Sequence, residues 1–290
     1  MPQPLSMVST VPEILAFVQS LQSYDKFAEA QIKETGRKAT WWWVGFAVSF
    51  ILVIAIGNSG APALVVLPIL TGILTLVMGI ISSIQYAKWK KENIEDRRLE
   101  LVTQLFAVLG RDIPRRAKCA VNVSFDDYRT HGTQVSLDKE GMFGSLKRYK
   151  YEDTWFTARG MLYDSNRFKI TITQNVHRKE KAKRKYTKIN ERIQEEITLL
   201  LKVSPESYPN VDRLAPALQA TVFEGLQVTR MLAEGNLLRI TCATPPATRL
   251  QGRYGTNASG WENLATGDTV LRLFLAVYGK LQECRATQAA

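Results

Sequence analysis

The densest run of charge in the chain is His177–Lys185, which reads His-Arg-Lys-Glu-Lys-Ala-Lys-Arg-Lys. Six basic residues against the single acid Glu180 give six minus one, a net charge of +5. The six basic residues are Arg178, Lys179, Lys181, Lys183, Arg184 and Lys185. Such a run can bind anionic lipid headgroups, at about 1 kcal/mol per residue near the surface, or nucleic-acid phosphates.

A third interpretation of this run is the solvated end of a β-hairpin, where positive charge discourages edge-to-edge association. Tyr186 is the only aromatic residue close to the run, so stacking on nucleic-acid bases has little support. The sequence therefore predicts a basic hairpin tip that is either a solvated turn, the preferred interpretation, or a surface that binds anions, with lipid favoured over nucleic acid.

A second candidate site begins with two arginines, Arg111 and Arg115, spaced as Arg-x-x-x-Arg and followed by Ser136. Guanidinium groups pair bidentately with phosphates and stack on flat rings, so this pattern suits a nucleotide. The pattern resembles the PilZ family of cyclic di-GMP receptors, in which Arg-x-x-x-Arg precedes a strand and an Asp/Asn-x-Ser-x-x-Gly turn. Gln134 stands where that turn has its acid or amide, and Gly141 comes two residues late. The resemblance implies a nucleotide-sensing regulator as the alternative function.

Catalytic chemistry has little support in this sequence. The two histidines, His131 and His177, lack metal-ligand spacing with each other or with cysteine. No glycine-rich phosphate loop or nucleophile elbow occurs. Cys119 and His131 could form a nucleophile pair, but Cys119 falls in an alternating, core-like stretch. We therefore expect no metal and no cofactor, and a membrane-bound enzyme is the least favoured class.

The three cysteines are an odd number and lie far apart in the chain, which argues against a disulfide scaffold and fits a reducing compartment. No cleavable signal peptide is expected, because the first apolar run starts only at Trp41.

The stretch Trp41–Ala87 contains no charged residue and is divided by Gly57–Pro62 into two apolar runs. A membrane-spanning helix needs about 20 apolar residues, so the stretch predicts a two-helix transmembrane hairpin. Gly72 and Gly79 lie on one helical face of the second run, where small residues let another helix approach closely. The expected partner of that face is the first run or a second copy of the chain.

Basic residues flank both outer ends of this hairpin, whereas its connecting loop has no charge. The flanking residues are Lys33, Arg37 and Lys38 before it and Lys88, Lys90, Lys91, Arg97 and Arg98 after it. Because cytoplasmic loops are rich in Lys and Arg, both termini are expected in the cytoplasm, with the hairpin in the plasma (inner) membrane. The net charge of +11 agrees with such an arrangement.

Four regions follow from these patterns. Residues 1–40 carry an amphipathic helix that begins at the capping box Thr10–Glu13, ends at Gly36 and either docks on the cytoplasmic domain or lies on the inner leaflet. Residues 41–87 form the hairpin, and residues 88–110 continue as a juxtamembrane helix. The last region, 111–290, is the cytoplasmic domain.

The region 111–290 predicts an α+β fold, an antiparallel β-sheet with packing helices. Alternating apolar and polar residues predict strands, most clearly at Arg167–Val176 and Ile189–Val203, which we expect to pair as one long hairpin. A last apolar helix is expected from Asp268 to Cys284. The combined prediction is a membrane-anchored binding or scaffold module of unknown specificity, which engages the lipid bilayer and a protein partner, a second copy or an anionic surface.

Overall fold

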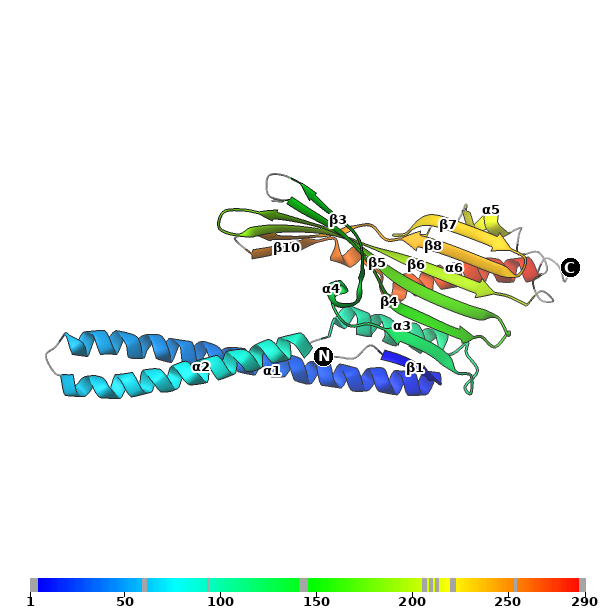
Figure 1. Ribbon diagram of the computed structural model, residues 1–290. Coiled ribbons are helices and arrows are strands. Elements are labelled where there is room, and N and C mark those ends of the chain that lie inside the picture. The colour runs from blue at the N-terminus through cyan, green and yellow to red at the C-terminus, as the bar shows by residue number, and fades with distance from the viewer. Residues whose placement is uncertain are drawn as a thin grey trace. The chain divides into compact units, whose positions relative to one another are not determined.

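The computed structural model describes residues 5–58, 62–92, 94–140, 146–204, 208, 211, 214–219, 223–252 and 255–286 (Figure 1). The chain divides into two compact units. The helical unit contains Gln19–Ile94, and the sheet unit combines Gln3–Val18 with Glu95–Ala290.

The helical unit is built from α1 (Val11–Gly57), a 3₁₀ turn η1 (Pro62–Val65) and α2 (Val66–Glu92). The expected helix end at Gly36 was wrong, because α1 continues through this residue. A β-carbon placed on Gly36 would lie 3.3 Å from Cε2 of Tyr86. The glycine therefore makes room for a ring of α2, and this packing outweighs its poor helix propensity.

The second half of α1 runs antiparallel to α2. Trp43 of α1 lies beside Gly79 of α2, and Ser49 lies beside Gly72. Residue numbers therefore increase along α1 while those of the neighbouring residues of α2 decrease. Gly72 and Gly79 are both buried, and each lies where a side chain of α1 comes closest. Of the two partners expected for this glycine face, the structure thus places the first apolar run against it.

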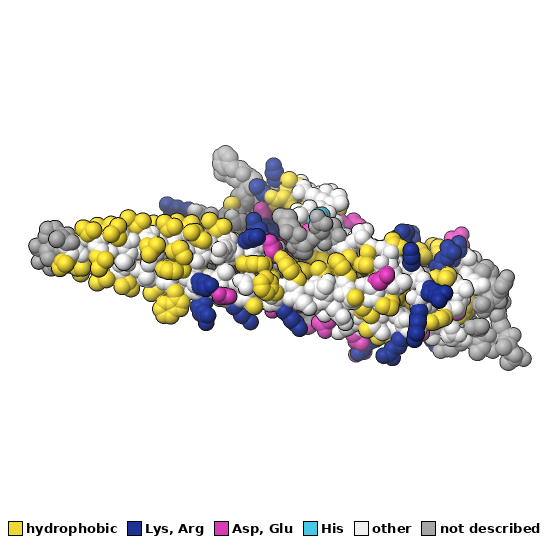
Figure 2. All heavy atoms as spheres, turned by 90° about the horizontal axis from the view of Figure 1, so that it is seen from below, with side chains coloured by type: hydrophobic (Ala, Val, Ile, Leu, Met, Phe, Trp, Pro, Cys, Tyr) yellow, Lys and Arg dark blue, Asp and Glu magenta, His cyan; other side chains and the backbone are white. Residues whose placement is uncertain are grey.

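The outside of this helix pair is apolar. Ile51 is 63% exposed, Leu67 70% and Ile84 64%, and apolar side chains dominate this part of the surface in Figure 2. Both helices are long and apolar enough to cross a membrane. The turn residues 59–61 that were expected to carry no charge lie outside the described residues.

The predicted continuous helix over 88–110 is interrupted in the structure. The first part, α2, ends at Glu92, and α3 (Asp96–Leu109) begins a new helix. The Asp25 carboxylate accepts a hydrogen bond of 2.9 Å from the backbone amide of Ile94. Because a side chain of α1 takes this amide, α2 cannot extend through it.

The sheet unit contains ten described strands, all paired antiparallel, so the predicted mixture of helices and antiparallel sheet is confirmed. The central order is β1-β2-β4-β5-β6-β8-β7, with β3 on one part of β4 and the pair β9–β10 on one part of β6. The strands are β1 (Leu5–Ser9), β2 (Cys119–Val123), β3 (Thr133–Glu140), β4 (Leu146–Met161), β5 (Arg167–Ala182), β6 (Thr187–Lys202), β7 (Gln227–Glu234), β8 (Leu237–Ala243), β9 (Ala247–Gly252) and β10 (Gly255–Ser259).

The hairpin β5–β6 confirms the expected pairing and is longer than predicted, with 16 residues in each strand. Its apolar residues alternate with polar ones, so Ile170, Ile172 and Ile197 all point to one buried face. Strand β4 carries a bulge at Trp155. Strands β1, β3, β9 and β10 were not predicted.

Helices cover one face of this sheet. The covering elements are α3, α6 (Gly267–Ala286), the short α5 (Leu214–Gln219) and the first turns of α1, whose Ile14 and Val18 are fully buried. Figure 1 shows α3 and α6 against the same side of the strands. Two short turns are also present: α4 (Tyr128–His131) lies between β2 and β3, and η4 (Trp261–Asn263) lies between β10 and α6.

A buried ion pair attaches α3 to the centre of the sheet. Arg97 donates two hydrogen bonds to Glu195 of β6, at 2.8 and 2.9 Å, and Glu195 has no exposed side-chain surface. The same carboxylate also accepts hydrogen bonds from Trp155 Nε1 (3.1 Å) and from the backbone amide of Ala265 (2.7 Å). Protein groups thus supply these four hydrogen bonds to the carboxylate.

We expect Glu195→Ala to destabilise the protein by about 3–5 kcal/mol, because Arg97 would be left without its buried partner. The double variant Arg97→Met/Glu195→Leu removes both charges and should lose less. Glu196→Ala, a neighbouring residue on the other face, is the matched control. Thermal unfolding of the full chain in detergent measures all three, and an equal loss for Glu196→Ala would contradict the assignment.

We expect Gly72→Ile/Gly79→Ile to separate α1 from α2 at a cost of about 1–3 kcal/mol per site, because the branched side chains overfill the contact. Gly72→Ala/Gly79→Ala is the control, since a β-carbon at either position meets its nearest neighbour at 3.5 Å, an ordinary contact. The unfolding temperature in detergent distinguishes them, and equal values for both pairs would show that this face tolerates bulk.

Candidate functional site

The predicted basic tip lies where β5 turns into β6. The amide of Lys183 donates to the carbonyl of Tyr186 at 2.8 Å and closes the turn. Five of the six basic residues are exposed, and none of these five forms an ion pair within the described part of the chain. The five are Lys179, Lys181, Lys183, Arg184 and Lys185.

Arg178 does not belong to this exposed set, so its assignment to the binding surface was wrong. The residue is 9% exposed and forms ion pairs with Glu180 at 2.6 Å and with Glu191 at 2.7 Å. Tyr128 completes the group, since its hydroxyl donates to Glu191 at 2.6 Å. Arg178 therefore acts in the packing of this end of the sheet.

Strand parity explains the difference between Arg178 and its neighbours. Successive side chains of a strand point to opposite faces, so Arg178 points to the covered face together with Val176. Val176 belongs to a buried cluster with Tyr128 and Leu264. Lys179 and Lys181 point to the opposite face of the sheet.

That opposite face, here termed the open face, is rich in basic side chains toward both ends of its long strands. Residues directly paired across antiparallel strands share a face, so the strand register identifies its members. Twelve are basic: Arg148, Lys150, Arg159, Arg167, Lys169, Lys179, Lys181, Lys188, Arg192, Lys202, Arg230 and Arg239. Five are acidic: Asp138, Glu140, Glu152, Glu196 and Glu234. Twelve minus five gives a net charge of +7.

The open face has hollows, of which two are lined by several basic residues. One, of about 490 Å³, lies next to the basic tip and is lined by His177, Lys179, Asn190, Arg192, Gln194 and Thr248. The other, of about 540 Å³, lies toward the opposite end of β5, where Arg159, Arg167, Lys169 and Lys202 are among its lining residues. The pKa of His177 is lowered, first by partial burial and then by Lys150, Arg192 and Lys179. The first hollow is therefore a region of positive potential.

Most of these open-face residues were missed by the sequence analysis. The signal existed in the alternation of basic residues along β5 and β6, for example Lys169 and Lys179 at odd positions and Arg192 and Lys202 at even ones. The sequence did not give the register between the strands. In the structure, odd-numbered residues of β5 pair with even-numbered residues of β6, and this pairing places their basic side chains on one face.

The residues that resemble the PilZ motif are separated in the structure. Arg111 and Arg115 are exposed in the loop after α3, where the carbonyl of Asp112 accepts a hydrogen bond from Tyr163, just beyond β4. Ser136 lies on β3 opposite Lys150, near the other end of β4. From Lys150 to the end of β4 at Met161 is roughly 35 Å at 3.3 Å per residue. The three residues therefore do not form one nucleotide pocket.

The thiol proposed as a nucleophile is buried away from solvent. A β-carbon placed on Gly160 would lie 2.8 Å from Sγ of Cys119, so the thiol fills the space beside this glycine. Burial raises the pKa of Cys119 and, to about 12, that of Cys242. His131 is instead exposed and its Nε2 lies 2.7 Å from the Asp126 carboxylate. Cys119 is thus a structural thiol in the core.

A polar cleft of about 480 Å³ lies beside His131 and is also lined by Ser124, Glu152 and Asp153. The side chain of Asp153 is 4% exposed, and its Oδ2 has no hydrogen-bond partner among the described residues. Burial raises the pKa of this carboxyl group, and the positive charge of Arg98 opposes the rise.

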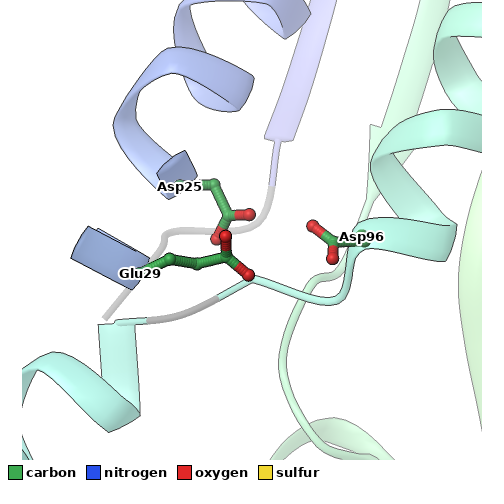
Figure 3. A group of neighbouring side chains, drawn as sticks. All are labelled: Asp25, Glu29 and Asp96. Carbon is green, nitrogen blue, oxygen red and sulfur yellow. The ribbon is translucent and has the colours of Figure 1, made fainter. Parts of the chain in front are cut away.

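Two carboxylates of α1, Asp25 and Glu29, lie one helical turn apart (Figure 3). Asp25 is the anchored one, since it accepts the amide hydrogen of Ile94 as described above. Asp96, also drawn in Figure 3, belongs to the sheet unit. The bond to Ile94 accounts for the burial of Asp25 without a metal ion.

Comparisons with known proteins give no match: no family model, no curated protein and no solved structure is similar to this chain. The surface chemistry of the chain itself is therefore the guide to its function.

The raised pKa of Asp153 predicts how the folding stability of the protein depends on pH. The folded state holds this proton more tightly than the unfolded state, so stability should fall as pH rises from about 3.9 through the folded pKa. Asp153→Asn removes this titration and should raise the unfolding temperature at pH 7. Glu152→Gln, an exposed neighbour in the same cleft, is the control. A lower unfolding temperature for Asp153→Asn would show that Arg98 holds the carboxylate as an anion.

Proposed function

We propose that this protein is a membrane-anchored binding module. The apolar parts of α1 and α2 insert as a hairpin, both termini stay in the cytoplasm, and the sheet unit engages an anionic partner. The supporting observation for the anchor is the exposed apolar surface between Trp41 and Ala87, which contains no charged residue. Leaving such side chains in water is unfavourable, whereas lipid accommodates them.

The supporting observation for the binding role is the exposure of the five tip cations without ion pairs among the described residues. Charged side chains that stabilise the fold differ from these five, because Arg178 is buried and paired with Glu191, and Arg97 is only partly exposed and paired with Glu195. Exposed cations on a neighbouring, open sheet face add to the same positive region. This surface can attract a polyanion through long-range electrostatics.

No observation favours the nucleotide-sensing alternative in the form that the PilZ resemblance implies, because Ser136 lies far from Arg111 and Arg115. The cleft beside His131 and Asp153 does not support the hypothesis of a Cys119–His131 nucleophile pair, because the Cys119 thiol is buried in the core.

The topology is tested by cysteine labelling in intact cells that produce the full chain. An engineered Ser59→Cys in the hairpin turn should react with a membrane-impermeant maleimide, because the turn is expected outside the cytoplasm. Lys183→Cys at the exposed tip is the matched control and should react only after the cells are permeabilised. The reverse pattern would overturn the orientation, and carbonate extraction of the chain from membranes would overturn the anchor.

A further inference from the structure

We propose that the open face of the sheet binds the sugar-phosphate backbone of a nucleic-acid duplex without reading its sequence. This inference deepens the proposed function by naming the chemical class of the anionic partner, and it rests on that function. Three features of the open face carry it: the arrangement of its charges, its neutral hydrogen-bonding groups and its shape.

The charges form an array of two groups, one toward each end of the long strands, rather than a single cluster. Along one strand, residues of the same face are about 6.7 Å apart, and neighbouring strands are about 4.8 Å apart. Lys169 and Lys179 on β5 and Arg192 and Lys202 on β6 belong to this array. A polymer with a phosphate at every unit can contact many of these cations at once, which a small anion cannot.

Neutral hydrogen-bonding side chains separate the cations. Threonine pairs span adjacent strands, with hydroxyl oxygens 3.0 Å apart between Thr154 and Thr173 and 3.1 Å apart between Thr198 and Thr241. Asn190 and Gln194 lie in the hollow near the tip. Hydroxyl and amide groups together with Lys and Arg are the usual partners of phosphate and sugar oxygens.

The two hollows favour nucleic acid over a lipid bilayer. Their linings include exposed cations, such as Lys179 and Arg192 at one end and Lys169 and Lys202 at the other, so a phosphate inside a hollow has basic groups around it. The ridge of a nucleic-acid backbone can enter a hollow, whereas the flat surface of a bilayer meets the protruding parts. The exposed turn of the tip remains available to either partner.

The absence of aromatic residues indicates a duplex. Among the paired open-face positions that the structure describes, none is Phe, Tyr or Trp. Proteins that bind single strands without sequence preference stack the bases on aromatic side chains. In a duplex the bases are already stacked and the phosphates face outward, so a face with a net positive charge and neutral hydrogen-bonding groups but no aromatic residue at these positions suits the duplex backbone.

The experiment uses the full chain in nanodiscs of neutral phosphatidylcholine and fluorescent duplexes of two unrelated sequences. Fluorescence anisotropy over a range of salt concentrations should give equal affinities for the two sequences and a steep decrease with salt. The test variant is Lys169→Gln/Lys179→Gln/Arg192→Gln. If all three residues contact phosphates, the slope of log affinity against log salt should decrease by about 3.

The control variant is Lys147→Gln/Arg249→Gln/Arg272→Gln, which removes the same formal charge from exposed positions off the open face. It should keep most of the wild-type slope and affinity. Equal losses in the two variants would overturn the assignment to the open face, and a strong preference for one sequence would overturn backbone recognition.

A competition arm separates this inference from the proposed function. Vesicles that contain phosphatidylserine are added to the same nanodisc sample with and without duplex. Binding to these vesicles but not to duplex at low salt would overturn the nucleic-acid inference and leave an anionic-lipid module. Binding to neither would overturn both the inference and the anionic-partner function, whereas displacement of vesicles by duplex would support the inference.

Discussion

The sheet unit depends on one buried negative charge. Glu195 has no exposed side-chain surface, and a carboxylate without partners in such a place would cost several kcal/mol. Its two oxygens are satisfied by Arg97, Trp155 and the amide of Ala265. These donors come from α3, from the bulge of β4 and from the segment before α6. Because a displaced donor would leave the charge unpaired, Glu195 fixes how these separate parts of the chain meet, as well as adding stability.

A second polar group, around Arg178, organises the distal part of the sheet in the same way. Arg178, Glu191 and Tyr128 satisfy one another beneath β5 and β6, next to the buried side chain of Val176. This arrangement commits one member of the basic run to the covered face. It also fixes the direction of its neighbours, so that Lys179 and Lys181 must point to the open face. The internal network and the external charge array are thus two consequences of a single strand register.

The sequence was sufficient wherever local periodicity decided the structure. Alternation in β5 and β6 and the uncharged stretch Trp41–Ala87 are local signals, and both correspond to elements of the structure. It was insufficient wherever a distant residue decided. Gly36 stays helical because Tyr86 packs against it, and α2 ends because Asp25 takes the amide of Ile94. For the candidate site, the run of lysines was visible, but the burial of Arg178 and the twelve-residue array required the pairing of strands.

The positions of the basic residues indicate two separate origins of the net positive charge of the chain. Lysines and arginines beside membrane spans are an ordinary feature of membrane proteins, and Lys33, Lys88 and Lys90 fit that explanation. The open face does not, because its net charge of +7 is carried by strands β3 to β8, far along the sequence from the apolar stretch. Two copies of such a face repel each other, which protects the sheet from stacking on itself. A polyanion would neutralise this charge and remove the repulsion, so the charge that opposes self-association would also favour a partner of opposite charge.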